Sequence, residues 1–206
     1  MNQTVFIVDD DQAVREAFGR ILEVAGFLVR IFSSAQLFLA ACMPEQMGCI
    51  LLDVQMPEMT GLELQAALSK CGILMPVVFL TAYGDVKTSV HTLQAGAFDF
   101  LEKPVPAAKL IESVRNAMAL DQAQHKIHAR FRKALINYAQ LTLREREIMK
   151  LIIIGHPNKV VAKELAISPR TVEVHRRNIL AKMQVNSLLE LAPLVEILNL
   201  DESDPS

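Results

Sequence analysis

The sequence contains no long apolar run. A helix needs about 20 consecutive apolar residues to cross a bilayer, and the longest candidate, residues 148–154, is interrupted by Lys150. The first residues, Met1 to Thr4, lack the basic patch and the apolar stretch of a signal peptide. We therefore expect a cytoplasmic protein that does not contact a membrane.

Cysteine is also scarce. The three cysteines, Cys42, Cys49 and Cys71, form no C-x-x-C pair, so we expect reduced, mostly buried thiols. His125 and His128 are the only histidines three residues apart. Two histidines alone are half of a ligand set for zinc, and the pattern therefore disfavours a zinc site.

Acidic residues are missing from one stretch, residues 122–140, which carries four basic residues. Before it, residues 1–120 carry 8 Lys/Arg and 13 Asp/Glu, a net charge of −5. After it, residues 141–200 carry 9 basic and 6 acidic residues, a net charge of +3. Hydrophobic residues make up 51% of the chain, which is enough for a buried core. An acidic front and a basic back indicate two domains, with nucleic acid as a candidate partner of the second.

The front domain, residues 1–121, alternates between short apolar runs and amphipathic segments. The apolar runs predict strands at residues 4–8, 28–32, 49–52, 77–80 and 98–101. The amphipathic segments predict helices at residues 13–25, 35–41, 62–68, 86–95 and 107–120. Five such repeats favour an α/β domain with a five-stranded parallel sheet, doubly wound so that helices cover both faces.

Charged and polar residues follow the ends of these strands. They are Asp9, Asp10 and Asp11 after the first strand, Asp53 after the third, Thr81 after the fourth and Lys103 after the fifth. The active crevice of a doubly wound sheet lies beyond these carboxyl ends. Clustered carboxylates suit Mg²⁺, an aspartate can accept a phosphoryl group, and a lysine stabilises the charge on that group. The sequence therefore predicts a phosphoryl-transfer site.

Four motifs in this order resemble the receiver domains of two-component response regulators. They are Val8-Asp9-Asp10-Asp11, Leu52-Asp53-Val54-Gln55-Met56-Pro57, Thr81-Ala82-Tyr83-Gly84 and Lys103-Pro104. The resemblance implies a flavodoxin-like fold in which a sensor histidine kinase phosphorylates Asp53. It implies that Asp9, Asp10, Asp53 and the backbone carbonyl of Gln55 bind Mg²⁺. It also implies that Lys103 contacts the phosphoryl group, that Thr81 and Phe100 form the switch, and that the Lys103-Pro104 bond is cis.

Some of these residues also have ordinary interpretations. Asp11 suits the N-cap of the first helix better than Asp9 or Asp10 does. Phe100 could be a core residue. Residues 122–140 lack Gly and Pro and predict a helical linker, or a continuation of the helix before it. The basic residues of this linker, Lys126, Arg130, Arg132 and Lys133, could contact DNA or form a solvated face.

The back domain, residues 141–200, predicts four helices. They span residues 144–153, 159–165, 169–183 and 188–198, with Thr142, Asn158, Ser168 and Ser187 as N-caps. A tight turn before a basic third helix is typical of a helix-turn-helix. On this third helix Val172, Ile179, Leu180 and Met183 share the expected core side. The opposite side, Arg170, Glu173, Val174, Arg177 and Ala181, would enter a major groove.

Several residues around this helix are candidates for other contacts. Lys159, Thr171 and Lys182 could contact DNA phosphates. Arg176 could contact DNA or form an ion pair with Glu145 or Glu147, and His175 is equally open.

The back domain also carries a specific residue string. It reads Leu141-Thr142-x-Arg144-Glu145-Arg146-Glu147, Gly155-x-x-Asn158-Lys159, Ile167 through Arg176, and Lys182-Met183. This string resembles the LuxR-type DNA-binding domain, and with the receiver the chain is similar to the NarL/FixJ class. The resemblance implies a transcription regulator that binds double-stranded DNA as a homodimer after phosphorylation, with RNA polymerase as a further candidate partner. The acidic tail, residues 201–206, has no assigned role.

Two other functions would use similar residues. Haloacid-dehalogenase-type phosphatases also use an aspartate nucleophile and Mg²⁺, but they place a second aspartate where this sequence has Gln55. A signalling adaptor with a protein-binding back domain would not need the basic linker or the Arg/Glu face. We therefore expect a DNA-binding regulator and not an enzyme.

Overall fold

The computed structural model describes residues 3–44, 46–82 and 96–197. The chain divides into two compact units, Met1–His125 and Lys126–Ser206. The boundary lies four residues beyond the predicted end of the front domain. The predicted helix at residues 86–95 and the acidic tail lie outside the described residues.

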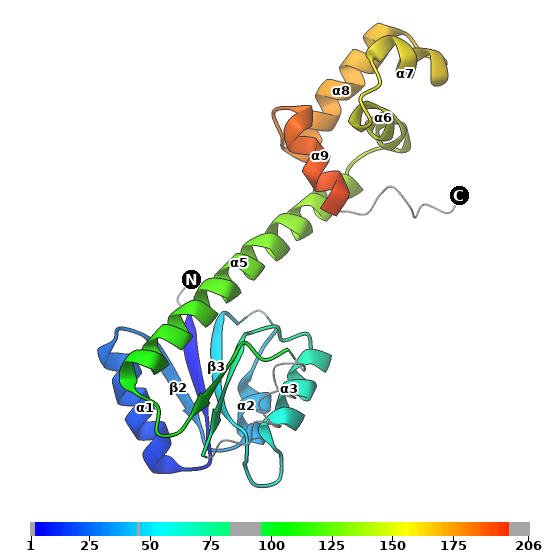
Figure 1. The fold of residues 1–206 in the computed structure, drawn as a ribbon. Helices are drawn as coiled ribbons and strands as arrows, with labels where there is room; N and C mark the ends of the chain where they lie inside the picture. The colour runs from blue at the N-terminus through cyan, green and yellow to red at the C-terminus, as the bar shows by residue number, and fades with distance from the viewer. Residues whose placement is uncertain (1–2, 45, 83–95, 198–206) are drawn as a thin grey trace. The chain divides into compact units, whose positions relative to one another are not determined.

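A five-stranded parallel sheet forms the centre of the first unit (Figure 1). Its strands are β1 (Thr4–Val8), β2 (Leu28–Phe32), β3 (Gly48–Asp53), β4 (Val77–Thr81) and β5 (Asp99–Glu102), in the order β2-β1-β3-β4-β5. The helices are α1 (Gln12–Val24), α2 (Ala35–Ala41), α3 (Gly61–Lys70) and α5 (Ala107–Ala139). The strand order reverses between β1 and β3, which is the switch point of a doubly wound sheet. The predicted fold class is confirmed.

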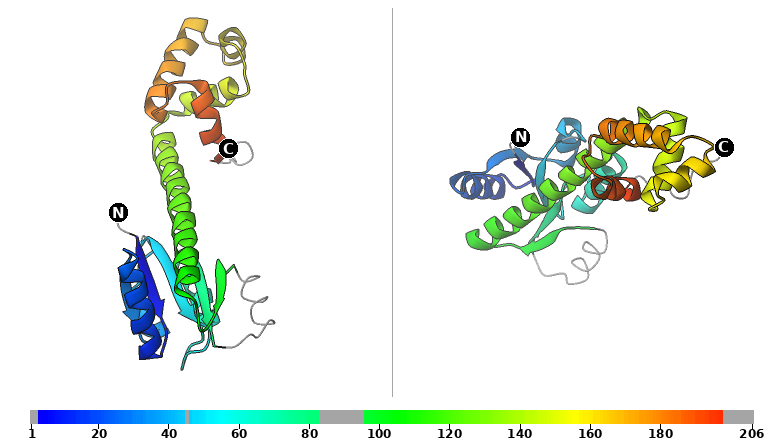
Figure 2. Two further views of the ribbon diagram at one scale, coloured as in Figure 1. Left: turned by 60° about the vertical axis from the view of Figure 1, so that its left-hand side comes forward. Right: turned by 90° about the horizontal axis from the view of Figure 1, so that it is seen from above.

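Helices cover the two faces of the sheet (Figure 2). Side chains of successive strand residues alternate between the two hydrophobic clusters beneath these helices. Phe6 and Val8 pack with Phe38 and Leu64, on the side covered by α2 and α3. Val5 and Ile7 pack with Leu22, Leu110 and Val114, on the side covered by α1 and α5. Because β1, β3 and β4 are buried on both faces, they read as continuous apolar runs in the sequence. The edge strand β2 is only partly buried.

Local signals explain where the helices next to the sheet begin. The Asp11 carboxylate caps α1 by accepting a hydrogen bond from the N–H of Ala13 at 2.8 Å, as predicted. Thr60 and Glu63 form a capping box at the start of α3. A Cβ atom on Gly61 would lie 2.3 Å from the carbonyl oxygen of Asp53. The absence of a side chain at Gly61 therefore lets α3 start against the end of β3.

Helix α5 runs without interruption through 33 residues and crosses the boundary between the two units. The second of the two predictions for residues 122–140, a continuation of the preceding helix, is therefore the correct one. In the first unit α5 buries Leu110, Val114, Ala117 and Met118. In the second unit it buries Ala134 and Asn137, and the Asn137 amide donates to the carbonyl of Met183 at 3.1 Å.

The second unit consists of the end of α5 and four further described helices, α6 (Leu143–Ile153), α7 (Asn158–Glu164), α8 (Pro169–Met183) and α9 (Leu188–Ile197). Thr142 and Glu145 form the predicted capping box, and Ser168 caps α8 ahead of Pro169. The prediction that Asn158 caps α7 is wrong. Asn158 is the first residue of that helix, and its side chain accepts a hydrogen bond from Arg176 at 2.8 Å instead.

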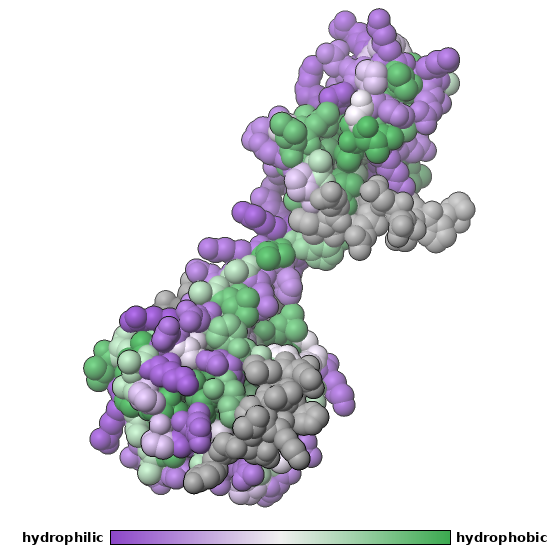
Figure 3. Space-filling view, in the orientation of Figure 1, coloured by the Kyte–Doolittle hydropathy of each residue, from purple (hydrophilic) through white to green (hydrophobic). Residues whose placement is uncertain are grey.

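The surface carries both hydrophilic and hydrophobic side chains, and green patches interrupt the purple along α5 in Figure 3. Ile127 and Ile136 of this helix are each 58% exposed. Among the described residues, no helix is both long enough and apolar enough to span a membrane.

Candidate functional site

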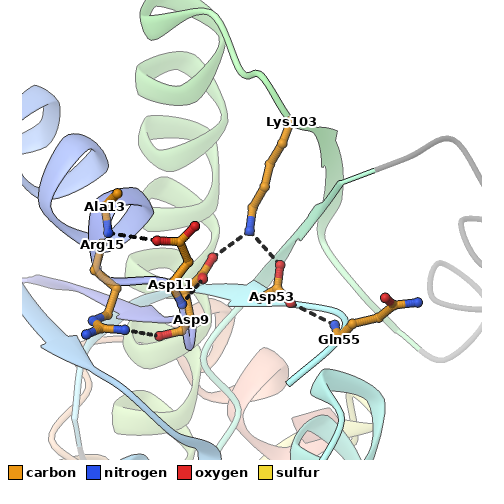
Figure 4. Close-up of polar contacts among 7 residues, drawn as sticks. All are labelled: Asp9, Asp11, Ala13, Arg15, Asp53, Gln55 and Lys103. Carbon is orange, nitrogen blue, oxygen red and sulfur yellow. Dashed lines mark hydrogen bonds and ion pairs between the residues drawn. The ribbon is translucent and has the colours of Figure 1, made fainter. Parts of the chain in front are cut away.

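Three side chains from three strand ends meet at the switch point of the sheet. Lys103, which follows β5, places its Nζ atom 2.6 Å from Asp9 Oδ2 and 2.6 Å from Asp53 Oδ1 (Figure 4). Asp9 is fully buried and Asp53 is 7% exposed. The convergence that the sequence predicted for these three residues is therefore observed.

Backbone groups fix the two carboxylates in place. Asp9 Oδ1 accepts a hydrogen bond from the N–H of Asp11 at 2.9 Å, and Asp53 Oδ2 accepts one from the N–H of Gln55 at 2.8 Å. The guanidinium of Arg15 donates to the carbonyl of Asp9 at 2.7 Å. Sequence reasoning missed Arg15, although its position one turn into α1 places it beside the strand end. Each carboxylate therefore directs one oxygen towards Lys103 and uses the other to hold its own loop.

The charges at this site do not balance. Burial raises the pKa of Asp53 above its usual 3.8, although the hydrogen bond and the charge of Lys103 oppose that shift. Burial lowers the pKa of Lys103, but Asp53 and Asp9 outweigh burial, so this pKa lies above its usual 10.5. Both pKa values are raised, so the ion pair favours the charged form of Lys103 but does not offset the effect of burial on the charged form of Asp53. A ratio of two carboxylates to one ammonium accounts for both, because Lys103 has two anionic partners while Asp53 shares its cation.

This imbalance bears on whether the residues could hold Mg²⁺. Asp9 and Asp53 supply hard oxygen atoms and retain net negative charge, which suits a divalent cation. The side chain of Asp10 is exposed, and the described contacts include none between it and Asp9, Asp53 or Lys103. Within the described parts of the chain, no three His, Cys, Asp or Glu side chains are arranged to hold a metal ion. Asp9 and Asp53 therefore fit the predicted role of metal ligands, and the role of Asp10 stays a prediction.

The two predicted switch residues lie on neighbouring strands. Thr81 ends β4, is half-buried, and its carbonyl accepts a hydrogen bond from the N–H of Lys103 at 2.7 Å. Phe100 lies on β5 opposite Phe79 and packs partly buried against the cluster covered by α2 and α3. The Lys103-Pro104 bond is cis, as the resemblance implied.

Helix α8 of the second unit has one buried and one exposed side. Val172, Ile179 and Met183 are buried, and Leu180 packs partly buried against them. The predicted outward residues, Arg170, Glu173, Val174, Arg177 and Ala181, are all exposed, as are Thr171 and Lys159. A helix with exposed arginine, glutamate and valine side chains can read base edges in a major groove.

Two basic residues of α8 have partners inside the unit. The Nζ atom of Lys182 lies 2.6 Å from Glu145 Oε2, and Glu145 is buried. Arg176 donates to Asn158, so the predicted ion pair with Glu145 or Glu147 is not the contact it makes. Burial raises the pKa of Glu145, but Lys182 and Thr142 outweigh burial and lower this pKa below its usual 4.5. Lys182 therefore stabilises the unit, whatever it does on DNA.

Known protein families match both parts of the chain. Residues 5–115 match the response regulator receiver domain, and residues 139–195 match the family described as bacterial regulatory proteins, luxR family. The chain belongs to the two-component response regulators with a LuxR-type DNA-binding domain. It is therefore a DNA-binding transcriptional regulator of a two-component system, and this architecture implies a kinase and DNA as partners.

Individual relatives cover almost the whole chain. The response regulator TodT of Pseudomonas putida is 39% identical over 192 residues, which are 93% of this chain and 85% of TodT. The transcriptional regulatory protein FixJ of Azorhizobium caulinodans is 40% identical over 205 residues, 98% of this chain and 97% of FixJ. The solved structure of the response regulator StyR has a TM-score of 0.86 and 40% identity, covering 95% of this chain and 99% of StyR. These relatives are regulators, and the predicted NarL/FixJ class is confirmed.

Proposed function

We propose that a sensor histidine kinase phosphorylates Asp53 in the cytoplasm and that the phosphoryl group controls DNA binding by α8. The observation that carries the proposal is the bridge of Lys103 between Asp9 and Asp53 at the switch point of the sheet. The bridge brings a nucleophilic carboxylate and a fixed positive charge together where a doubly wound sheet binds its ligand.

The reaction is a transfer from nitrogen to oxygen. A carboxylate oxygen of Asp53 attacks the phosphorus of a phosphohistidine, and a P–O bond forms. The P–N bond breaks, and its electron pair stays on the histidine nitrogen. Lys103, already 2.6 Å from Asp53, then faces the phosphoryl oxygens and stabilises their charge. The buried backbone of β3 holds Asp53 in position during the transfer.

Mg²⁺ is the cofactor that the donor set supports. Asp9 and Asp53 would hold the ion, with Asp10 and the carbonyl of Gln55 as further ligands. A bound Mg²⁺ supplies the charge compensation that two carboxylates and a phosphoryl group require. Among the described contacts, Lys103 is the one cation that meets the Asp9 carboxylate, since Arg15 donates to the backbone carbonyl of Asp9 instead. Lys103 is therefore free to turn toward the phosphoryl group only when another cation neutralises Asp9.

Double-stranded DNA is the target of the second unit. Arg170, Glu173, Val174 and Arg177 on the exposed side of α8 would read base edges, while Lys159 and Thr171 would contact phosphates. Lys182 could join the phosphate contacts only by sharing its ammonium group with Glu145. RNA polymerase is the further partner expected for a regulator bound at a promoter.

Dimerisation is the proposed link between phosphorylation and DNA binding. The phosphoryl oxygens would accept a hydrogen bond from Thr81 and draw it inward, and Phe100 would rotate into the space beside β5. That movement changes the surface of β5 and of the predicted helix at residues 86–95, which would form the dimer face. Two linked DNA-binding units then occupy adjacent half-sites, gaining about 10²–10⁴ in avidity without new base contacts.

The test of the phosphoacceptor uses a small phosphodonor such as acetyl phosphate with Mg²⁺. We expect intact-mass measurement to show one added phosphoryl group on the wild-type chain and none on Asp53→Asn. Asp11→Asn is the matched control, because asparagine can replace aspartate as the cap of α1. Equal labelling of the wild type and of Asp53→Asn would rule out Asp53 as the acceptor.

A further inference from the structure

A second buried carboxylate lies at the opposite end of β3 from Asp53. Asp121 on α5 is fully buried, and its Oδ2 atom accepts a hydrogen bond from the N–H of Gly48 at 2.9 Å. Gly48 is the first residue of β3, and Asp53 is the last residue of the same strand. One strand therefore joins the phosphoacceptor to a polar contact on α5.

Two further contacts fasten the same turn of α5. The side-chain amide of Gln3 donates to the carbonyl of Met118 at 2.7 Å, which ties α5 to the start of β1. Nδ1 of His125 lies 3.1 Å from Asp121 Oδ1. Gly48 has a φ of 152°, and a Cβ atom there would lie 1.8 Å from the carbonyl oxygen of Thr4. A side chain at Gly48 would therefore displace the strand ends to which α5 is attached.

Burying the carboxylate of Asp121 at this position costs folding free energy. Burial raises its pKa, and the N–H of Gly48 and the charge of His125 only oppose that rise. Its Oδ1 atom is buried and has no hydrogen-bond partner among the described residues, so it depends on the ion pair with His125. Buried charges of this kind destabilise a fold unless they are fully paired. A leucine at Asp121 would remove the buried charge but would leave the N–H of Gly48 without its acceptor, so the aspartate is specific to the contact with β3.

The position of Asp121 along α5 indicates its role in the receiver. Residues 126–133, which follow His125, are all exposed, and the next buried residue of the helix is Ala134 in the second unit. Asp121 is thus the last buried residue by which the receiver holds this helix. Every residue of β3 between Gly48 and Asp53 is buried and close-packed, and packed interiors transmit displacement rather than absorb it.

We propose that Asp121 is a positioning residue through which the receiver controls the linker helix, by tying α5 to the amino end of the strand that carries Asp53. This inference rests on the proposed function. It assigns the attachment of α5 to Asp121, and Gln3, which precedes β1, supports the same turn through the carbonyl of Met118 and through Asp121 itself. The phosphoacceptor site itself does not include Asp121, so the two roles are separable by experiment.

The test compares DNA affinity of the full chain with and without acetyl phosphate. Sites coupled within one protein typically alter each other's affinity about 5–150-fold, and we expect Asp121→Ala to reduce the wild-type enhancement to about twofold or less. Phosphoryl uptake, read by intact mass, should stay at the wild-type level. Asp121→Asn keeps an oxygen acceptor for Gly48 and should retain most of the enhancement. Glu112→Ala, an exposed position on α5, is the matched control and should behave as wild type.

Hydrogen exchange separates positioning from general support of the fold. We expect Asp121→Ala to lose amide protection in residues 118–125 while the strands stay protected; loss throughout the first unit would overturn the proposal. Full enhancement in Asp121→Ala would also overturn it. If Asp121→Ala does not fold, Gln3→Ala decides, and a wild-type enhancement in that variant counts against the proposal. Phosphorylation of the wild type without any change in DNA affinity would instead refute the proposed function, while the exchange result still tests the tie.

Discussion

Asp9 and Asp53 share one ammonium group, and this ratio explains the behaviour of each residue at the site. Lys103 contacts both carboxylates at 2.6 Å, so it neutralises one of the two negative charges. The remaining negative charge lies in a buried place, and burial, together with the charge of Asp9, raises the pKa of Asp53. A site with surplus buried charge is stabilised by binding a cation, because a ligand that binds only the folded state stabilises that state.

At the residue scale we therefore predict that Mg²⁺ stabilises the protein against heat. At 100 times its dissociation constant, a ligand of the folded state contributes about 2.7 kcal/mol. We expect MgCl₂ to raise the unfolding midpoint of the wild type relative to NaCl of equal ionic strength, and excess EDTA to reverse the increase. Asp53→Asn removes the surplus charge and should lose most of the increase. Asp11→Asn should keep it, and an equal increase in all three proteins would contradict a specific site.

Residue patterns in the sequence predicted backbone positions at this site better than side-chain directions. Asp9, Asp53 and Lys103 follow strand ends, and parallel strands bring these ends to one edge. Asp10 follows Asp9 directly, but it lies in a bend beyond the end of β1, and its side chain is exposed while that of Asp9 is buried. Asp121 was missed, because a single aspartate at the start of a polar segment looks like a surface residue. Only the Gly48 contact, 73 positions away in sequence, shows its role.

At the scale of elements, the prediction succeeded where one pattern dominated. The buried strands are continuous apolar runs and α8 has a period of 3.6 residues, and these elements lie where the pattern places them. Whether residues 122–140 form a separate helical linker or continue the preceding helix depends on packing against segments that are distant in the sequence. The sequence therefore left both alternatives open. The contact of Lys182 could not be predicted for the same reason, since its partner Glu145 lies 37 positions away in the sequence.

The two basic residues Arg177 and Lys182 on α8 should consequently differ in their effects. Arg177 is exposed, so Arg177→Ala should weaken specific DNA binding by about 1–3 kcal/mol and relax the preference at one base pair. Its free energy of unfolding should change by less than about 0.5 kcal/mol. Lys182→Ala leaves the buried Glu145 without its cation and should lower the free energy of unfolding by about 1–3 kcal/mol.

Denaturant unfolding and binding to a selected site measure the two effects separately. Glu145→Gln is the companion variant, because it should make the loss caused by Lys182→Ala smaller when both changes are combined. Lys182→Ala could instead keep the wild-type free energy of unfolding and bind every DNA sequence more weakly. That result would support the DNA-phosphate contact that the sequence predicted for Lys182.

At the scale of the whole molecule, phosphorylation should act through association. We predict that Thr81→Ala still accepts one phosphoryl group but dimerises poorly, because the variant lacks the hydroxyl that responds to the phosphoryl oxygens. A modification shifts an equilibrium only by its different affinity for the two states. Light scattering with and without acetyl phosphate measures the mass. A wild-type chain that stays monomeric while its DNA affinity rises would point instead to relief of inhibition between the two units.

Residues 126–133 of α5 have one further consequence, for how sequences of this kind can vary. All eight residues are exposed, so packing in a core does not constrain their side chains. The length of the segment matters more, since each added residue turns everything downstream by about 100° and moves it by about 1.5 Å. Seven added residues make almost two full turns, so the residues after the insertion keep nearly the same rotation about the helix axis. We therefore expect insertions of seven residues in this segment to alter the course of α5 least.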